Sequence, residues 1–488
     1  MKNLIFIIVL LPILCFAQKQ GNIWYFGDHA GLDFNTSPPT ILTDGQTAYI
    51  GCSGCHAEGT AVICDSSGTL LFYTDGNRIW NRNHQIMPDG DGLYSNISST
   101  QSSLIVPQPG SSRYFYVFTT DDFFVDHLQY GLRYSLVDMC LDNGNGDIVK
   151  DQKNILLLDM VAEKLTAVRH TNGEDYWIIT HKYYSDAFYT YHLSSLGIVD
   201  TVISHVGSAH PTGNQTESGA IGQLKASPNG QKLAIVNGNS SNNIAEYFDF
   251  DNSTGVVSNC IDIQWNINYN FYGISFSPDN SKLYIACTLN GNGIYQFDLN
   301  AGGGNPDSVR VSRTLITGSY NYNYFGLQLA TNGKIYAARS PFLNNSILSV
   351  IDNPNNPGTS CNYIDAVIDF GNNWVSYGFP NFIDSYDYSN TSEYCYTEIE
   401  EKGINELIDI FPNPTTGPIT INNEETQVRQ SQLRMMNVAV YDIYGKEVLK
   451  QEVRIQKYVI DLSTQPNGIY IVKVTTSKGV AVEKVVKN

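Results

Sequence analysis

The chain has 488 residues, a length that suits two or three domains. Only 16% of the residues are charged, and the abundance of tyrosine, asparagine and glycine favours strands joined by tight turns. The formal net charge of −18 argues against nucleic acid or an anionic membrane as the main partner. Residues 404–488 are nearly balanced in charge, so the chain divides into two regions of different character.

The first 17 residues have the pattern of an export signal peptide. Lys2 supplies the positive start, residues 4–16 form an apolar core, and we expect cleavage after Ala17. Lipid attachment at Cys15 is an alternative that the bulky Leu14 disfavours. The apolar run is shorter than the ~20 residues of a membrane helix, and no later segment qualifies, so we expect no transmembrane segment.

A short motif at Cys52, Cys55 and His56 has the spacing of covalent c-type haem attachment. Haem sites of this kind usually lie in small helical domains, whereas this motif precedes a predicted strand. Removal of the signal peptide leaves eight cysteines in an oxidising compartment. A disulfide of Cys52 and Cys55, with each other or with Cys64, is therefore the plainer interpretation, and we expect no haem.

One structural unit recurs between residues 57 and 340. Each copy has an apolar strand, a tight polar turn, a second aromatic or β-branched strand and a further hairpin. The turns contain Asn-Gly or related sequences because the chain reverses through residues with positive φ. The turns are Asp65–Gly68, Gln108–Ser111, Thr171–Glu174, Ser227–Gly230, Ser277–Asn280 and Ala330–Gly333. Their spacing is about that of the four strands and loops of a β-propeller blade.

Strand-like segments without a complete blade stand at both ends of this region, at residues 23–34 and 375–382. Joining them in one sheet would close the ring and remove its unpaired edges. The sequence therefore predicts an all-β fold with a β-propeller over residues 22–388. We expect seven blades, with six or eight as alternatives, and an array of β-sandwiches is the competing interpretation.

Several polar residues could carry chemistry. Asp-rich segments at residues 89–92 and 142–147 offer oxygens for calcium, although tight turns select the same residues. Acid, base or metal-ligand candidates are Asp121, Asp122, Asp126 and His127, and separately His170 with His181. No recognisable catalytic motif accompanies them, so we interpret each first as a structural residue. We expect no cofactor, with calcium as the one alternative.

An aromatic cluster precedes two predicted inner strands. The starts of inner strands face the central funnel of a propeller, so aromatic side chains there could stack on sugars or contact peptide. The residues predicted to bind ligand are Trp265, Tyr269, Tyr272, Tyr322 and Tyr324. The competing interpretation is packing between blades, which also requires large aromatic residues.

The C-terminal segment alternates apolar and polar residues around turn signals, as in a small β-sandwich. Residues 404–488, after a linker at 389–403, resemble the type A C-terminal sorting domain of the type IX secretion system of Bacteroidetes. The residues that carry the resemblance include Pro412, Asn413, Pro414, Gly417, Tyr441, Asp442, Gly445, Lys446, Gly468 and Tyr470. The alternative is an adhesive sandwich that stays on the protein.

The sorting-domain resemblance implies recognition by the type IX secretion machinery, then cleavage and either attachment to surface lipopolysaccharide or release. The propeller resembles a group of secreted Bacteroidetes proteins of unassigned function. The stretches concerned include Trp24–Gly27, Ala30–Phe34, Leu71–Gly76, Ser99–Ser102, Leu104–Pro107, Glu163–Val168 and Tyr176–His181. That group implies a fold and a location but no catalytic residues.

These features lead us to expect export by Sec and then the type IX system, through the periplasm, to the outer cell surface or the extracellular space. We expect a binding or adhesion module for an extracellular glycan or protein, because aromatic and Asn-rich loops are carried on a rigid ring. The alternative is a polysaccharide lyase or hydrolase with its site in the propeller funnel. A redox protein at the Cys52–His56 motif is a third hypothesis.

Overall fold

The computed structural model describes residues 19–47, 58–210, 219–238, 243–265, 270–288, 292–319, 321–340, 346–388, 408–423, 435–453, 457–476 and 479–488. The chain divides into two compact units, residues 1–394 and 395–488. The predicted signal peptide at 1–17 and the linker at 389–403 lie outside the described residues. No helix among the described residues is long and apolar enough to cross a membrane.

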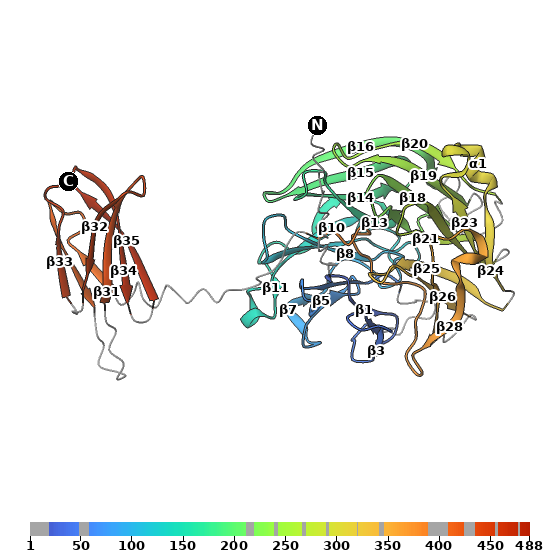
Figure 1. The fold of residues 1–488 in the computed structure, drawn as a ribbon, viewed down its shortest axis with the longest axis horizontal. Coiled ribbons are helices and arrows are strands. Elements are labelled where there is room, and N and C mark those ends of the chain that lie inside the picture. The colour runs from blue at the N-terminus through green and yellow to red at the C-terminus, as the bar shows by residue number, and fades with distance from the viewer. Residues whose placement is uncertain are drawn as a thin grey trace, which may run out of the picture. The chain divides into compact units, whose positions relative to one another are not determined.

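Seven antiparallel sheets follow one another in the described part of the first unit (Figure 1). The first three sheets comprise β1 (Ile23–Phe26), β2 (Ala30–Asp33) and β3 (Thr40–Leu42); β4 (Ala61–Cys64), β5 (Leu70–Thr74), β6 (Arg78–Asn81) and β7 (Ile86–Asp91); and β8 (Ser103–Pro107), β9 (Tyr114–Thr119), β10 (Leu132–Asp138), β11 (Asp147–Ile148) and β12 (Ile155–Leu158). The third sheet is the largest because both β11 and β12 pair with β10.

The next four sheets have four strands each, hydrogen-bonded in sequence order. They comprise β13 (Val161–Arg169), β14 (Tyr176–Lys182), β15 (Ser185–Ser194) and β16 (Gly197–His210); β17 (Leu224–Ala226), β18 (Lys232–Asn237), β19 (Ile244–Asp251) and β20 (Val256–Asp262); β21 (Asn270–Phe276), β22 (Lys282–Thr288), β23 (Gly293–Asp298) and β24 (Thr314–Gly318); and β25 (Asn323–Leu329), β26 (Ile335–Ser340), β27 (Ile347–Ile351) and β28 (Tyr363–Asp369). A short helix, α1 (Pro306–Val311), joins β23 to β24, and Asn305 caps its N-terminus.

The first strands of successive sheets contact one another, from β1 through β4, β8, β13, β17 and β21 to β25. The chain therefore winds sheet by sheet around a common axis, with these strands innermost. Most of them are buried at every position, as expected for strands packed on both faces. The first unit is a β-propeller, as the spacing of the turns predicts.

The ends of the propeller meet next to β1. Asp28 and Trp374 exchange backbone hydrogen bonds of 2.8 and 3.1 Å, and the Asn381 backbone N–H donates to the Thr60 carbonyl at 2.7 Å. These contacts form isolated bridges rather than a continuous ladder. The expected count of seven blades therefore depends on treating the three-stranded first sheet, with this C-terminal segment beside it, as one blade.

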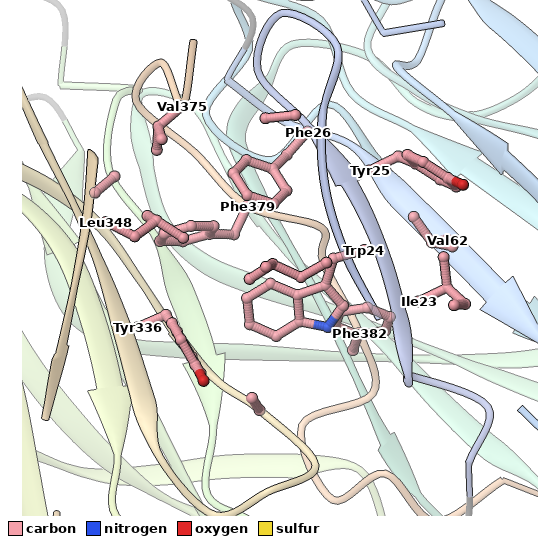
Figure 2. Packing of buried hydrophobic residues seen from close by; sticks show 14 of the residues in the cluster. Ile23, Trp24, Tyr25, Phe26, Val62, Tyr336, Leu348, Val375, Phe379 and Phe382 are labelled. Atoms are coloured by element: carbon pink, nitrogen blue, oxygen red, sulfur yellow. The ribbon is translucent and has the colours of Figure 1, made fainter. Parts of the chain in front are cut away.

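Trp24 on β1 is the centre of the hydrophobic cluster at this closure. Figure 2 shows its indole among Tyr336, Phe379 and Phe382, and the ring centroids lie 5.6, 5.7 and 5.9 Å away, respectively. The indole is fully buried, and its N–H donates to the Gly21 carbonyl at 3.1 Å. The first sheet, the last sheet and the C-terminal segment of the propeller thus share one core.

The second unit is a small sandwich of two sheets. Its strands are β29 (Ile408–Phe411), β30 (Pro418–Asn423), β31 (Met435–Asp442), β32 (Glu447–Glu452), β33 (Lys457–Asp461), β34 (Gly468–Thr476) and β35 (Gly479–Lys487). One sheet has the order β29-β30-β33 and the other β32-β31-β34-β35. Ile419 and Ile421 of the first sheet share a buried cluster with Val438, Val440 and Val472 of the second. The predicted C-terminal sandwich is confirmed.

Candidate functional site

The starts of the inner strands bring together a buried polar group that we call the inner-strand cluster: Glu58, Thr100, Glu163, Lys164 and Tyr272. Glu58 precedes β4, Thr100 precedes β8, Glu163 and Lys164 lie on β13, and Tyr272 lies on β21. All five residues are buried. The cluster therefore joins four sheets near the propeller axis.

Hydrogen bonds satisfy most of this cluster from within. The Glu163 carboxylate accepts from the backbone N–H and the hydroxyl of Thr100 at 2.8 and 2.7 Å, and from the Phe123 N–H at 2.8 Å. The Lys164 ammonium donates to the carbonyls of residues 220–222 at 2.7 to 3.1 Å. Burial raises the pKa of Glu163 and lowers that of Lys164. Both side chains thus hold neighbouring backbone in place.

Glu58 is also hydrogen-bonded within the cluster. Its carboxyl group accepts a hydrogen bond from the Tyr272 phenol. Burial, together with the negative charge of Glu163, raises the pKa of Glu58 well above its usual range. A carboxyl with a raised pKa is a candidate general acid, so Glu58 has a chemical as well as a structural capacity.

The loop after β9 gathers three of the predicted acidic residues. Carboxylate oxygens of Asp121, Asp122 and Asp126 lie within 4.8 Å of one another. The Asp122 carboxylate accepts from three backbone N–H groups, those of Phe124, Val125 and Asp126, at 2.8 to 2.9 Å. Asp121 accepts from the backbone of Asp122 and Tyr130. These bonds order the loop, and the grouped oxygens still offer a place for calcium.

The other polar candidates are not gathered in the same way. His127 is exposed, and its Nδ1 lies 3.1 Å from the Phe123 carbonyl. The two Asp-rich segments are neighbours, because the Asp147 carboxylate accepts from the Asp89 N–H at 2.8 Å. His170 precedes β14 and His181 lies near the end of that strand, so the two do not meet. The His170 ring stacks on His192, with centroids 5.2 Å apart.

Three of the predicted aromatic ligand residues lie in three different hydrophobic clusters. Trp265 packs on Phe271 and belongs with β21 to β23. Tyr272 belongs to the cluster of Trp24, and Tyr324 to that of the seventh sheet. This packing favours the competing interpretation, in which the aromatic residues fill the space between blades.

Two predicted aromatic residues remain. Tyr322 is half-buried, with the Arg339 guanidinium 4.3 Å from its ring centroid. Tyr269 lies outside the described residues, as do Cys52, Cys55 and His56.

Cys64 is a free, buried thiol on β4, so the expected alternative of a disulfide to Cys64 is absent. Every residue of β4 is buried, and the Cys64 side chain belongs to the hydrophobic cluster around Trp24.

A pocket of about 230 Å³ lies where β13 and β17 end. The turns at 171–173 and 227–230 form two of its walls, and Ser385 and Asp387 form part of a third. Arg169 at the end of β13 bonds both to the Asp387 carboxylate and to the Gly173 carbonyl. The turns were visible in the sequence, but Arg169 and Asp387 are 218 residues apart and carry no local signal.

The residues that carry the sorting-domain resemblance mainly hold the sandwich of the second unit together. The Asn413 side chain donates to the Lys484 carbonyl at 2.6 Å and accepts from the Val486 N–H at 2.9 Å, between Pro412 and Pro414. Gly417 is closely packed, because a Cβ there would lie 2.1 Å from the Ser463 hydroxyl. The loop from Pro412 to Gly417 is therefore tied to the last strand.

Residues that carry the resemblance also hold the hairpin between β31 and β32 in place. Tyr441 and Asp442 end β31, and the Asp442 carboxylate accepts from the N–H groups of Tyr444 and Lys446, each at 2.9 Å. Gly445 has a φ of 79°, which the turn requires. At the start of β34, after Gly468, the Tyr470 hydroxyl donates to the Pro466 carbonyl at 2.7 Å.

Comparison with known proteins identifies this unit. Residues 409–488 match the family of the secretion system C-terminal sorting domain. The resemblance seen in the sequence is confirmed, and proteins with this domain are exported through the type IX secretion system to the cell surface or the extracellular space. The interaction of this unit with the secretion machinery follows from the same match.

Solved structures with a similar fold share little sequence with the chain. A quinonprotein alcohol dehydrogenase-like protein from Bacteroides thetaiotaomicron is 12% identical, with a TM-score of 0.39, over 75% of this chain and 79% of that one. A periplasmic gluconolactonase from Pseudomonas aeruginosa is 12% identical, with a TM-score of 0.36, over 83% and 99%. The β-propeller domain of Cps50 (Swd1) from Myceliophteria thermophila is 11% identical, with a TM-score of 0.37, over 68% and 91%. No curated protein matches the chain in sequence.

Proposed function

We propose that this chain, exported by way of its C-terminal sorting domain, acts outside the cell as a binding module for a glycan. The observation that carries the proposal is the pocket beside Arg169. Its walls offer guanidinium donors, the Asp387 carboxylate and backbone groups of two turns. Sugar hydroxyls both donate and accept hydrogen bonds, so a wall with both kinds of partner suits them.

The size and position of the pocket support a small ligand unit. Pockets for drug-sized ligands are roughly 300 to 1,000 Å³, so a volume of about 230 Å³ suits about one sugar ring, such as the end of a chain. Both walls are tight turns, and turns on a rigid scaffold are where binding residues concentrate. The Arg169–Asp387 pair fixes the polar groups before a ligand arrives, which lowers the entropic cost of binding.

The test is binding of the purified chain to an array of glycans, in calcium and in chelator. We expect a saturable signal from the wild type and at least a tenfold loss of affinity in Asp387→Ala. The matched control is Asp159→Ala, which removes the exposed ion pair with Lys182 on the same sheet and should leave binding unchanged. Absence of any glycan signal, or equal binding by Asp387→Ala, would contradict the proposal. Loss of the signal in chelator would show that binding requires a divalent cation such as calcium.

A second candidate function is polysaccharide cleavage, and one observation favours it. Glu58 is a buried carboxyl with a raised pKa beside the Tyr272 hydroxyl, which is the environment of a general acid. Turnover of a polysaccharide by the wild type, abolished in Glu58→Gln, would support this function. Inactivity of the wild type across polysaccharides would leave Glu58 with its structural role.

We propose that cleavage after export separates the propeller from the sorting unit. The two are separate compact units, so cleavage between them would leave the propeller intact. The released propeller is then either attached to surface lipopolysaccharide or set free. The mass of the mature protein, measured after separation of cells from medium, distinguishes the two fates.

A further inference from the structure

Two histidines lie side by side between the fourth and fifth sheets. His181 is on β14 and His210 ends β16, and their ring centroids are 4.4 Å apart at an interplanar angle of 31°. Their exposed fractions are 1% and 0%. The Nδ1 atom of His181 and both ring nitrogens of His210 have no hydrogen-bond partner among the described residues.

Unpaired polar atoms at this depth require an explanation. Buried donors and acceptors are almost always satisfied in folded proteins, and the exceptions often mark a position where water or an ion belongs. Burial of a polar group without a partner is unfavourable, and three such nitrogens lie in one place here. The histidine pair is therefore a candidate ligand set rather than an ordinary packing contact.

A carboxylate from the neighbouring sheet completes the set. Glu246 on β19 is buried, and its Oε2 lies 4.0 Å from Nε2 of His210. Ser208 holds this carboxylate, because its hydroxyl donates to Oε1 at 2.6 Å and its backbone N–H donates to Oε2 at 3.3 Å. Cys260 on β20 also hydrogen-bonds with Glu246. The His210 imidazole and the Cys260 thiol thus lie next to this carboxylate, and the His181 imidazole lies against His210.

We propose that His181, His210 and Glu246 form a binding site for a divalent metal ion of the zinc type. Imidazole nitrogen, carboxylate oxygen and thiolate sulfur are the donors that zinc takes. Donors bound at about 2.0–2.2 Å to one tetrahedral ion lie about 3.5 Å apart, which is near the present separation of His210 and Glu246. The donor atoms of the three residues do not yet all lie within 4.8 Å of one another, so metal binding requires them to draw together. Cys260, which hydrogen-bonds with Glu246, is the neighbouring fourth donor.

The charges around the histidine pair are mixed. Burial and the positive charge of Lys164 lower the pKa of both histidines, which favours neutral imidazoles, and the Lys164 ammonium donates to the carbonyls of residues 220–222. The Glu246 carboxylate supplies a compensating negative charge, and Ser208 orients it as an outer-shell partner does in known metal sites. The ion would link β14 and β16 of one sheet to β19 of the next.

The test uses the untagged full chain, stripped of metal and titrated with Zn²⁺ by calorimetry and with Co²⁺ by visible absorption. We expect one site per chain that requires the histidines, and at least a 100-fold weaker affinity in the double variant His181→Gln, His210→Gln. The control is His205→Gln, because His205 is exposed on the same strand and pairs with Asp186. Circular dichroism establishes that each variant is folded.

A second variant keeps the test decisive if the double variant does not fold. Glu246→Gln retains an oxygen that can accept from Ser208, and we expect it to weaken Zn²⁺ binding at least tenfold. Failure of the wild-type chain to bind Zn²⁺ would overturn the proposal, because the nitrogens would then belong to buried water. Binding unchanged in the folded variants would also overturn it and would assign the ion to other donors.

Discussion

The phenol of Tyr272 donates a hydrogen bond to the carboxyl group of Glu58, although the two residues are 214 positions apart in the sequence. Tyr272 starts the inner strand of the sixth sheet, and Glu58 precedes the inner strand of the second. Burial raises the pKa of both groups above their usual ranges. The bond thus joins two distant blades near the propeller axis.

Replacement of Tyr272 by phenylalanine should therefore destabilise the propeller. The variant leaves the buried Glu58 carboxyl without its donor, which costs about 1–3 kcal/mol. The measurement is the free energy of unfolding from urea titration. Tyr322→Phe is the control, since that ring is half-buried and lies under the Arg339 guanidinium. If the two variants are equally stable, the Tyr272–Glu58 bond contributes little.

Removal of the indole at the ring closure should be more damaging. Trp24→Ala leaves a cavity among Phe379, Phe382 and Tyr336, and substitutions of this kind cost about 3–5 kcal/mol. We expect a lower urea midpoint for the propeller transition. The control is Phe124→Ala, which should leave the urea midpoint unchanged because the Phe124 side chain is exposed. A small effect at Trp24 would mean that the closure is not part of the cooperative unit.

Asp75 should make the propeller less stable as the pH rises from about 4 to 6. Burial raises its pKa to about 6, whereas an unfolded aspartate has a pKa of about 3.9. The folded state therefore holds the proton more tightly, and this contribution is fully present below pH 4 and lost as the pH rises through 6.

The test is Asp75→Asn, whose side-chain oxygen can still accept from the backbone of Asn77 and Arg78. At pH 7 the variant should be more stable than the wild type by about 2–3 kcal/mol, and the difference should vanish below pH 4. The exposed Asp200→Asn serves as the control. A difference that does not change between pH 4 and 7 would show that Asp75 does not titrate in this range.

A chain that ends at Tyr388 should fold but fail to reach the surface. The propeller and the sorting domain are separate compact units, so removal of the second leaves the first intact. We expect the shortened protein in the periplasm, measured by fractionation and by surface labelling of whole cells. Full-length protein processed in parallel is the control. Normal surface display of the shortened chain would contradict the role of the sorting domain.

Local chemistry explains what the sequence could predict. The turn at Ser277–Asn280 closes with a 2.9 Å hydrogen bond from Asn280 to Ser277, and Asn280 has a φ of 65°. Serine, proline, aspartate and asparagine select that geometry without help from the rest of the fold. The recurrence of such turns was therefore enough to predict a propeller, and the Asp442 turn helped in the same way to predict the sandwich.

The candidate sites could not be predicted in this way because their members are far apart in the chain. Arg169 and Asp387 meet only after the ring is closed, and His210 meets Glu246 across two sheets. The aromatic residues show the opposite problem. A tyrosine at the start of an inner strand has the same sequence signal whether it faces a ligand or, like Tyr324, packs between blades.

The bridge between Asp28 and Trp374 joins residues near the two ends of the propeller sequence. A ribosome makes β1 first and residue 374 only when nearly all of the propeller has been synthesised. The contact that completes the ring beside β1 therefore cannot form until the last part of the propeller is available.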